Sequence, residues 1–268
     1  MLAACIAFLR GARSVGLLRS KRFYSHVPYI GVVDVAAGAG HFRIMSRGHN
    51  IENALYWEGL LGHEPTTMRL WVDAAANSRT VLDVGANSGV FGLAASAAGA
   101  KMVHAFEPLP RIYSILDENY RLNSFSGAMA WPFAVGDSSG TAIIYDPGGD
   151  APTSASLSEG FARQNFGDVP GVEVAVVSVD DFCRSHEIEN VDLIKLDVEG
   201  FEKYALRGMR GTVSQYEPTI LMEVLAGHED GLRAEVEALW PGRYEWRPID
   251  EGNGYVSRNV LLCPRYRA

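Results

Sequence analysis

The sequence of 268 residues has few cysteines, little positive charge and no long hydrophobic run. Its three cysteines are scattered and form no Cys-x-x-Cys pair, which argues against a disulfide framework and a structural zinc site. No apolar stretch approaches the roughly 20 residues of a membrane-spanning helix. With 24 Lys and Arg against 32 Asp and Glu, the net charge of −8 disfavours a broad electrostatic grip on nucleic acid. We expect a small or neutral substrate and a reducing, cytoplasmic compartment.

The positive charges are concentrated at the start of the chain. Before Asp34 the only charged residues are basic: Arg10, Arg13, Arg19, Lys21 and Arg22. This segment predicts a basic amphipathic lead-in helix, which would be able to touch an anionic membrane surface. A helix that packs on the domain, or a frayed extension, is the more ordinary interpretation of the same pattern.

The apolar patterns divide the chain near residue 76. Residues 50–76 show helical apolar spacing, and we take residues 1–76 as a helical cap or extension. Over residues 77–268, apolar runs alternate with helical patterns, which is typical of a parallel sheet wrapped by helices. The expected strands are 80–84, 101–106, 129–135, 191–196, 219–224 and 259–263, with an inserted hairpin of 141–145 and 172–177 around a long loop. The sequence therefore predicts one α/β domain.

A glycine-containing loop follows the first expected strand of this domain and leads into a helix. It reads Asp83-Val-Gly85-Ala86-Asn87-Ser-Gly89. Gly85 permits a tight turn with close backbone approach, and Gly89 permits close packing of the following helix. The spacing lacks the Gly-x-Gly-x-x-Gly of a dinucleotide site, and no Gly-x-x-x-x-Gly-Lys-Ser/Thr of a nucleotide-phosphate loop occurs. The loop therefore indicates a cofactor without a closely held pyrophosphate.

Two acidic residues stand at the ends of the first two expected strands. Asp83 would repel a pyrophosphate but attract the ammonium group of an amino-acid moiety. Glu107 ends the next strand, where doubly wound sheets hold an acid against a ribose diol. An amino-acid end and a ribose on one ligand favour S-adenosylmethionine as the cofactor. An NAD-dependent oxidoreductase stays open as an alternative, and it predicts tight NADH binding.

Four sequence blocks together resemble the FkbM-type S-adenosylmethionine-dependent methyltransferases. They are Asp83-Val-Gly-Ala-Asn-Ser-Gly89, then Phe106-Glu-Pro-Leu-Pro110 with Leu116-x-x-Asn119-x-x-Leu122-Asn123, then Val191-Asp-Leu-Ile-Lys-Leu-Asp-Val-Glu-Gly200-x-Glu202, and Pro218-Thr-Ile-Leu-Met-Glu223. The similarity runs from about Glu64 to Pro264. It implies an α/β, Rossmann-like class I methyltransferase sheet of seven strands with the last antiparallel, here behind the N-terminal helical cap.

The resemblance also implies where the cofactor binds. The loop residues Asp83, Gly85, Ala86, Asn87 and Gly89 would line its methionine end. Glu107, with Pro108 beside it, would hold the ribose, and Ala134 and Val135 at the end of the third strand would contact the adenine. Members of the family typically methylate hydroxyl groups, often on sugars or natural-product scaffolds. We therefore expect a small-molecule or glycan acceptor, with a sugar-containing one favoured.

Removal of the proton from a hydroxyl acceptor calls for a basic group near the end of the fourth strand. Asp197 and Glu199 stand there at a spacing that places both on one side of an extended chain, and Glu223 ends the fifth strand. Paired carboxylates can raise one another's pKa and yield a general base. If a divalent metal binds, these three acids are its expected ligands, but no histidine joins them in sequence and a metal-free site is favoured. A purely structural interpretation has Asp197 or Glu199 capping the next helix or pairing with a neighbouring lysine.

Other interpretations predict different outcomes from the same patterns. His41 has the intrinsic pKa of a base, but the sequence gives it no partner, so a surface or packing role is preferred. A methyltransferase directed at a nitrogen or a carboxylate would need little or no base. A non-catalytic cofactor-binding scaffold would bind S-adenosylmethionine but never release S-adenosylhomocysteine.

Overall fold

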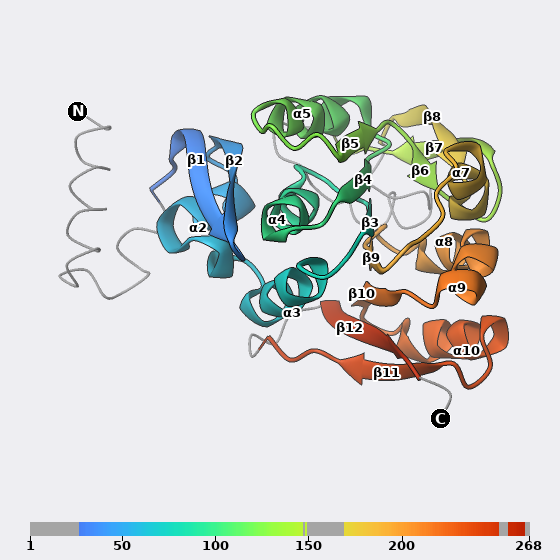
Figure 1. The fold of residues 1–268 in the computed structure, drawn as a ribbon. Coiled ribbons are helices and arrows are strands. Elements are labelled where there is room, and N and C mark those ends of the chain that lie inside the picture. The colour runs from blue at the N-terminus through green and yellow to red at the C-terminus, as the bar shows by residue number, and fades with distance from the viewer. Residues whose placement is uncertain (1–26, 147, 149–168, 252–256, 266–268) are drawn as a thin grey trace.

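The computed structural model describes residues 27–146, 148, 169–251 and 257–265, with a seven-stranded sheet at its centre (Figure 1). Its strands are β3 (Thr80–Val84), β4 (Met102–Phe106), β5 (Ala128–Trp131), β9 (Leu193–Leu196), β10 (Thr219–Leu225), β11 (Tyr244–Pro248) and β12 (Ser257–Pro264). Their order is β11-β12-β10-β9-β3-β4-β5. The five strands from β10 to β5 are parallel, and β12 runs antiparallel to both its neighbours. The predicted Rossmann-like sheet with an antiparallel last strand is confirmed.

The central strands are covered on both faces. All residues of β3 and β9 are buried, as expected for parallel strands between layers of helices. Because side chains alternate along a strand, Val81 packs into one hydrophobic core and Leu82 into the other. Each fully buried aliphatic side chain of this kind contributes about 1.5–3 kcal/mol. The first core is joined by α4 (Val90–Ala98) and α5 (Pro110–Arg121), together with α2 (Asn50–Glu58) and α3 (Pro65–Ala75) from the N-terminal part. The second core is joined by α7 (Val179–Ser185), α8 (Glu202–Gly208), α9 (Arg210–Tyr216) and α10 (Glu229–Leu239).

The N-terminal part differs from the predicted helical cap over residues 30–47. These residues form an antiparallel hairpin of β1 (Ile30–Ala37) and β2 (Gly40–Arg47). Burial alternates along both strands, and Gly38, at φ 58°, closes the two-residue turn. The small residues around the turn hide this period of two in the sequence. The helical prediction holds beyond the hairpin, where α2 (Asn50–Glu58), the short η2 (Leu60–Gly62) and α3 (Pro65–Ala75) follow.

A small sheet of three strands lies beside the central sheet. It comprises β6 (Ala134–Val135), β7 (Gly140–Tyr145) and β8 (Gly171–Val177), in the order β6-β8-β7. The antiparallel pairing of β7 with β8 confirms the predicted hairpin. The single strand predicted at 129–135 is instead two, β5 and β6, because the chain leaves the central sheet after Trp131.

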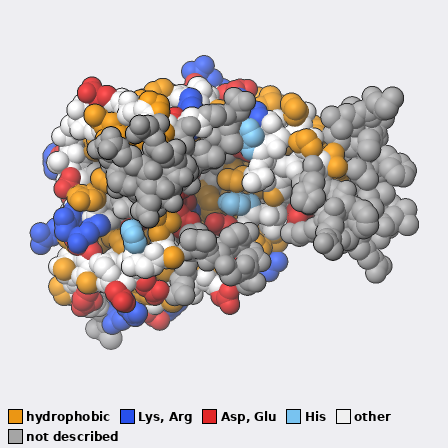
Figure 2. Space-filling model, turned by 180° about the vertical axis from the view of Figure 1, so that it is seen from behind, with side chains coloured by type: hydrophobic (Ala, Val, Ile, Leu, Met, Phe, Trp, Pro, Cys, Tyr) orange, Lys and Arg blue, Asp and Glu red, His pale blue; other side chains and the backbone are white. Residues whose placement is uncertain are grey.

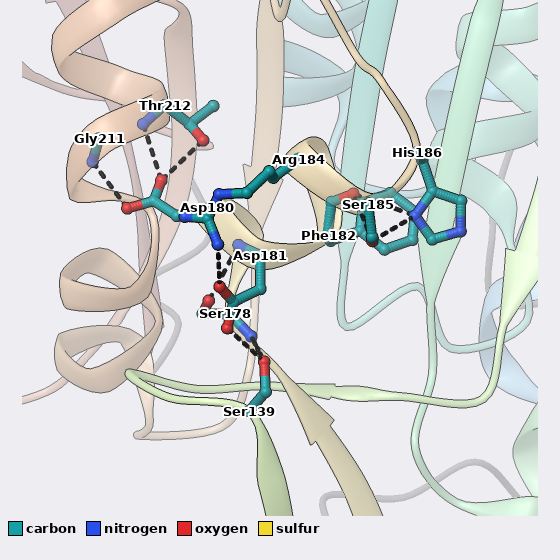
Figure 3. A network of polar contacts seen from close by, with 10 residues as sticks. All are labelled: Ser139, Ser178, Asp180, Asp181, Phe182, Arg184, Ser185, His186, Gly211 and Thr212. Carbon is teal, nitrogen blue, oxygen red and sulfur yellow. Dashed lines mark hydrogen bonds and ion pairs between the residues drawn. The ribbon is translucent and has the colours of Figure 1, made fainter.

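Polar contacts around the short helix α7 fix the small sheet against the second core (Figure 3). Ser178 caps the helix by accepting a hydrogen bond from the backbone of Asp181, and the Asp181 carboxylate accepts one from Ser139 at 2.7 Å. The neighbouring Asp180 accepts hydrogen bonds from the backbone nitrogens of Gly211 and Thr212 at the start of α9. This helix-start contact ties α7 to α9 and thereby sets the position of β8.

Two predictions fall outside the described residues. They are the basic lead-in helix within residues 1–26 and most of the long loop between β7 and β8. Of the helices in the described ranges, none combines the length and the apolar character needed to cross a bilayer.

Candidate active site

A cavity opens at the carboxyl ends of the central strands, where open α/β sheets bind ligands. Its volume, with the open mouth included, is about 1050 Å³, comparable to the larger small-molecule sites. Figure 2 shows a hollow in one face of the molecule where acidic, histidine and hydrophobic side chains lie together. All the predicted cofactor residues line the cavity except Gly89, and of the three predicted catalytic acids Asp197 and Glu199 line it and Glu223 does not.

The loop after β3 is held in a shape that side chains would obstruct. Gly85 has φ 82°, and a Cβ there would lie 1.7 Å from the carbonyl oxygen of Asp197. Its amide, and that of Ala86, donate to the carbonyl oxygen of Phe106 at 3.0 and 2.9 Å. Gly89, at φ 92°, has a different role, because a Cβ there would collide with Leu116 of α5. Gly85 therefore shapes the cavity, and Gly89 permits α4 to pack on α5.

Asp83 lies at the bottom of the cavity with 1% of its surface exposed. Its Oδ2 accepts a hydrogen bond from the backbone nitrogen of Gly92 in α4 at 2.8 Å. Burial raises the pKa of this carboxyl to about 6, opposed by the positive charge of Lys195. A ligand ammonium group beside Asp83 would favour its ionised form.

Glu107 occupies the neighbouring strand end and is held by two backbone amides. Its carboxylate oxygens accept hydrogen bonds from the nitrogens of Asn87 and Leu109, both at 3.1 Å. Burial is the main reason that the pKa of Glu107 is raised to about 7. These contacts orient the carboxylate before any ligand binds, and they link the glycine loop to the end of β4.

An apolar wall stands beside Glu107. Ala134 and Val135 belong to it, as the sequence predicted, although they lie on β6 and not on the third strand of the central sheet. Leu109 and Ile112 from the start of α5, with Ile144 from β7, complete the wall. Sequence reasoning missed these three because the placement of β7 against α5 is a tertiary contact.

A buried ion pair underlies the acidic residues of the cavity. Lys195 on β9 is 2% exposed, and its Nζ donates to Oδ2 of Asp197 at 2.8 Å. This ammonium group, together with a hydrogen bond to Glu223, opposes the effect of burial and holds the pKa of Asp197 below its ordinary value. The pairing of Asp197 with a neighbouring lysine, predicted as the structural alternative, is present. The prediction that a neighbouring acid raises the pKa is wrong for Asp197, whose pKa is lowered.

Asp197, Glu199 and Glu223 nevertheless come together. One carboxylate oxygen from each lies within 4.8 Å of the others. Glu199 reaches this position with φ 52°, so the chain is not extended as the spacing argument assumed. These three oxygens lie close enough together to hold a metal ion, and the ammonium of Lys195 already contacts one of the three acids, Asp197, so the metal-free site stays a prediction. The backbone nitrogens of Val198 and Gly200, in the loop before α8, donate hydrogen bonds to the Glu202 carboxylate. Glu202 therefore makes the contacts at the start of α8 that the structural interpretation gave to Asp197 or Glu199.

The N-terminal part of the chain also supplies residues to the cavity. Ile51 from α2 and His63 from the turn before α3 line it. The next residue, Glu64, accepts a hydrogen bond from Asn259 of β12 at 3.0 Å. The sequence analysis considered His41 and preferred a surface or packing role for it, and His41 indeed lies exposed on the hairpin, 3.1 Å from Asp34, and is not among the cavity residues.

Fold and site together define a class I methyltransferase, whose fold implies S-adenosylmethionine as the methyl donor. Residues 83–255 match the family model described as the methyltransferase FkbM domain, and the chain belongs to this family. The resemblance seen in the sequence is thereby confirmed.

Two named methyltransferases are similar to the chain. It is 28% identical over 204 residues to methyltransferase sdnD of Sordaria araneosa, covering 63% of this chain and 77% of that protein. It is 25% identical over 197 residues to hexuronic acid methyltransferase AglP of Haloferax volcanii, covering 73% and 74% of the two chains. A crystal structure of methyltransferase FkbM from Methylobacillus flagellatus superposes with a TM-score of 0.49 and 17% identity over 69% of this chain and 43% of that one.

Proposed function

We propose that this protein transfers a methyl group from S-adenosylmethionine to a hydroxyl group of a sugar-containing small molecule or glycan. The observation that carries the proposal is one cavity whose wall holds the cofactor-type residues Asp83 and Glu107 and also the acidic residues Asp197 and Glu199. A cofactor site and a set of groups suited to a hydroxyl acceptor thus face the same space.

The chemistry of the cavity fits S-adenosylmethionine. Asp83 offers a carboxylate for an ammonium group, and Glu107 offers a preoriented carboxylate for a ribose diol. Between them the backbone at Gly85 leaves space that a Cβ would fill, and the wall at Ala134 and Val135 suits an adenine ring. When bound, the cofactor supplies a methyl group on a positively charged sulfur.

The charge around Asp197 favours a neutral acceptor over an anionic one. Three acidic side chains gather there. Asp197 and Glu223 share a hydrogen bond and hence a proton, so the group still carries more negative charge than the ammonium of Lys195 offsets, and a carboxylate acceptor would meet net repulsion. A sugar hydroxyl can instead donate a hydrogen bond to Asp197 or Glu199, which aligns its oxygen for attack. We propose these two acids, with Glu223 behind Asp197, as participants in orienting the acceptor and assisting the loss of its proton.

A sugar-containing acceptor is supported by the relative named as a hexuronic acid methyltransferase. A hexuronic acid carries both hydroxyl groups and a carboxylate, so the relative alone does not choose between ether and ester products. The acidic cluster of this chain favours the ether. We also propose a cytoplasmic location, in line with the reducing compartment that the three scattered cysteines indicate.

A panel of acceptors tests the proposal. Purified protein is incubated with S-adenosylmethionine and methyl glucoside, methyl glucuronoside or glucosamine, while release of S-adenosylhomocysteine and the product mass are measured. We expect methylated products that survive mild alkali, because ethers do and esters do not. Alkali-labile or N-methylated products would refute the hydroxyl assignment, and cofactor binding with no turnover on any acceptor would indicate a scaffold. The variant with Asp197→Asn, Glu199→Gln and Glu223→Gln is expected to lose most activity, and an unchanged rate would exclude these acids.

A further inference from the structure

His63 stands at a fixed corner beside the acidic residues of the cavity. It lies between η2 and α3 and lines the same cavity as Asp197, and its positive form would lower the pKa of that carboxyl. Among the described residues that line the cavity, it is the one histidine. It also lies outside the stretch that matches the family model, which begins at residue 83.

The backbone around His63 is held from several directions. Glu64 adopts a left-handed conformation at φ 42°, which costs a residue with a side chain roughly 1–2 kcal/mol. The hydrogen bond from Asn259 to the Glu64 carboxylate holds this conformation, and Glu251 accepts one from the backbone nitrogen of Thr66 at 2.9 Å. Gly62 packs so closely on α2 that a Cβ there would lie 2.4 Å from the carbonyl oxygen of Ala54. A strained corner held by distant elements is typical of a functional position.

Two of the three acidic residues, Asp197 and Glu223, are poorly suited to take the proton of an acceptor. Asp197 is engaged by the Lys195 ammonium and keeps its negative charge, so its basicity is low. Glu223 does not line the cavity. An imidazole has an intrinsic pKa near neutrality, which suits proton removal, and an ionised carboxylate beside it stabilises the imidazolium that forms.

We propose that His63 is the general base that deprotonates the acceptor hydroxyl, with Asp197 stabilising its protonated form. This inference rests on the proposed function, since only a hydroxyl acceptor has this proton to lose. The hydroxyl proton moves to the unprotonated ring nitrogen of His63, and the acceptor oxygen forms a bond to the methyl carbon. The carbon–sulfur bond breaks with its electron pair remaining on sulfur, which gives an ether and S-adenosylhomocysteine. The imidazolium then releases its proton to water through the open mouth of the cavity.

The test compares His63→Ala with His41→Ala, a matched change at an exposed histidine on the hairpin. Acceptors are the methyl glucoside and methyl glucuronoside of the panel, and S-adenosylhomocysteine binding is followed by calorimetry. For His63→Ala we expect kcat to fall by about 100-fold or more, with the affinity for S-adenosylhomocysteine within about threefold of the original. Added imidazole should raise the kcat of His63→Ala by at least about tenfold. His41→Ala should retain the original kcat.

The outcomes separate the two proposals. If the unaltered protein methylates no hydroxyl, the proposed function fails before any variant is examined, and the role of His63 fails with it. If the unaltered protein is active but His63→Ala keeps its kcat within about threefold, or loses it without rescue by imidazole, only the inference is overturned. Should His63→Ala not fold, His63→Gln decides, because glutamine preserves the bulk without the basicity and retention of rate would refute the assignment.

Discussion

Replacing Lys195 by methionine isolates the buried ion pair beneath the cavity. Methionine retains about the length and the apolar character of the lysine stem. It removes the ammonium group, and with it the contact of Nζ with the Phe91 ring, whose centre lies 4.8 Å away. The variant leaves the carboxylate of Asp197 partly buried without its partner at 2.8 Å. The change therefore measures what the charge contributes, with little change in packing.

The magnitude follows from the distance and the burial. Two unit charges 2.8 Å apart interact by about 6 kcal/mol at an effective dielectric constant of about 20. Removing one partner of a buried pair costs about 3–5 kcal/mol in practice, because the remaining charge stays desolvated. Asp197 keeps 32% of its side chain exposed and is partly solvated, so we expect the low end, a loss of about 3 kcal/mol in the free energy of unfolding at pH 7.5.

The loss of stability in Lys195→Met should depend on pH, whereas the loss caused by a simple packing defect would not. In the native protein the pKa of Asp197 is lowered, so its stabilising contribution is constant above pH 5 and is lost only in strong acid. Without Lys195, burial raises that pKa, and a group with a raised pKa loses its stabilising contribution as the pH increases. The stability difference between Lys195→Met and the original protein should therefore widen from pH 5 to pH 8.

Urea denaturation at several pH values measures these differences. The control is the double variant Lys195→Met with Asp197→Asn, in which the unpaired charge is gone. It should recover about 2 kcal/mol of the loss at pH 7.5 and flatten the pH dependence. A double variant no more stable than Lys195→Met, or a difference that narrows as the pH rises, would refute the account of the ion pair.

Two further predictions concern the cofactor side of the cavity. The pKa of Glu107 is raised to about 7, so carboxylate formation should increase the affinity for S-adenosylhomocysteine by about tenfold from pH 6 to pH 8, while the ligand-free protein loses stability. Calorimetry measures this affinity at each pH. The reasoning would be contradicted if Glu107→Gln bound S-adenosylhomocysteine as tightly as the original protein and with the same pH dependence. Gly85→Ala should abolish cofactor binding or folding, whereas Gly227→Ala, also at positive φ but in open space, should cost only about 1–2 kcal/mol in thermal denaturation. Equal losses would show that close packing at Gly85 is unimportant.

The sequence predicted the central sheet, and all but one of the residues that it assigned to the cofactor line one cavity, because both features depend on local signals. Buried parallel strands are short apolar runs, and the residues that follow them, such as Asp83 and Glu107, meet at one edge of the sheet by topology alone. The glycine spacing of the loop after β3 is equally local. These features therefore required no knowledge of long-range contacts.

The missed features depend on contacts between distant parts of the chain. The position of His63 is fixed through its neighbours Glu64 and Thr66, which contact Asn259 and Glu251 almost 200 residues away in sequence. No local sequence pattern predicts such contacts. The low pKa of Asp197 depends on the burial of Lys195, which a spacing argument treats as a surface charge. The hairpin at residues 30–47 was hidden because its turn is rich in glycine and alanine.

The insertion of β12 between β10 and β11 bears on how the chain folds while it is being synthesised. Until residues 257–264 leave the ribosome, β10 has no neighbour on that side and presents an unpaired edge rich in apolar residues. Asn259, which fastens the corner at Glu64, emerges in the same stretch. Between the synthesis of β10 and that of β12, a nascent chain therefore passes through an aggregation-prone stage, during which chaperone binding to β10 would be most valuable.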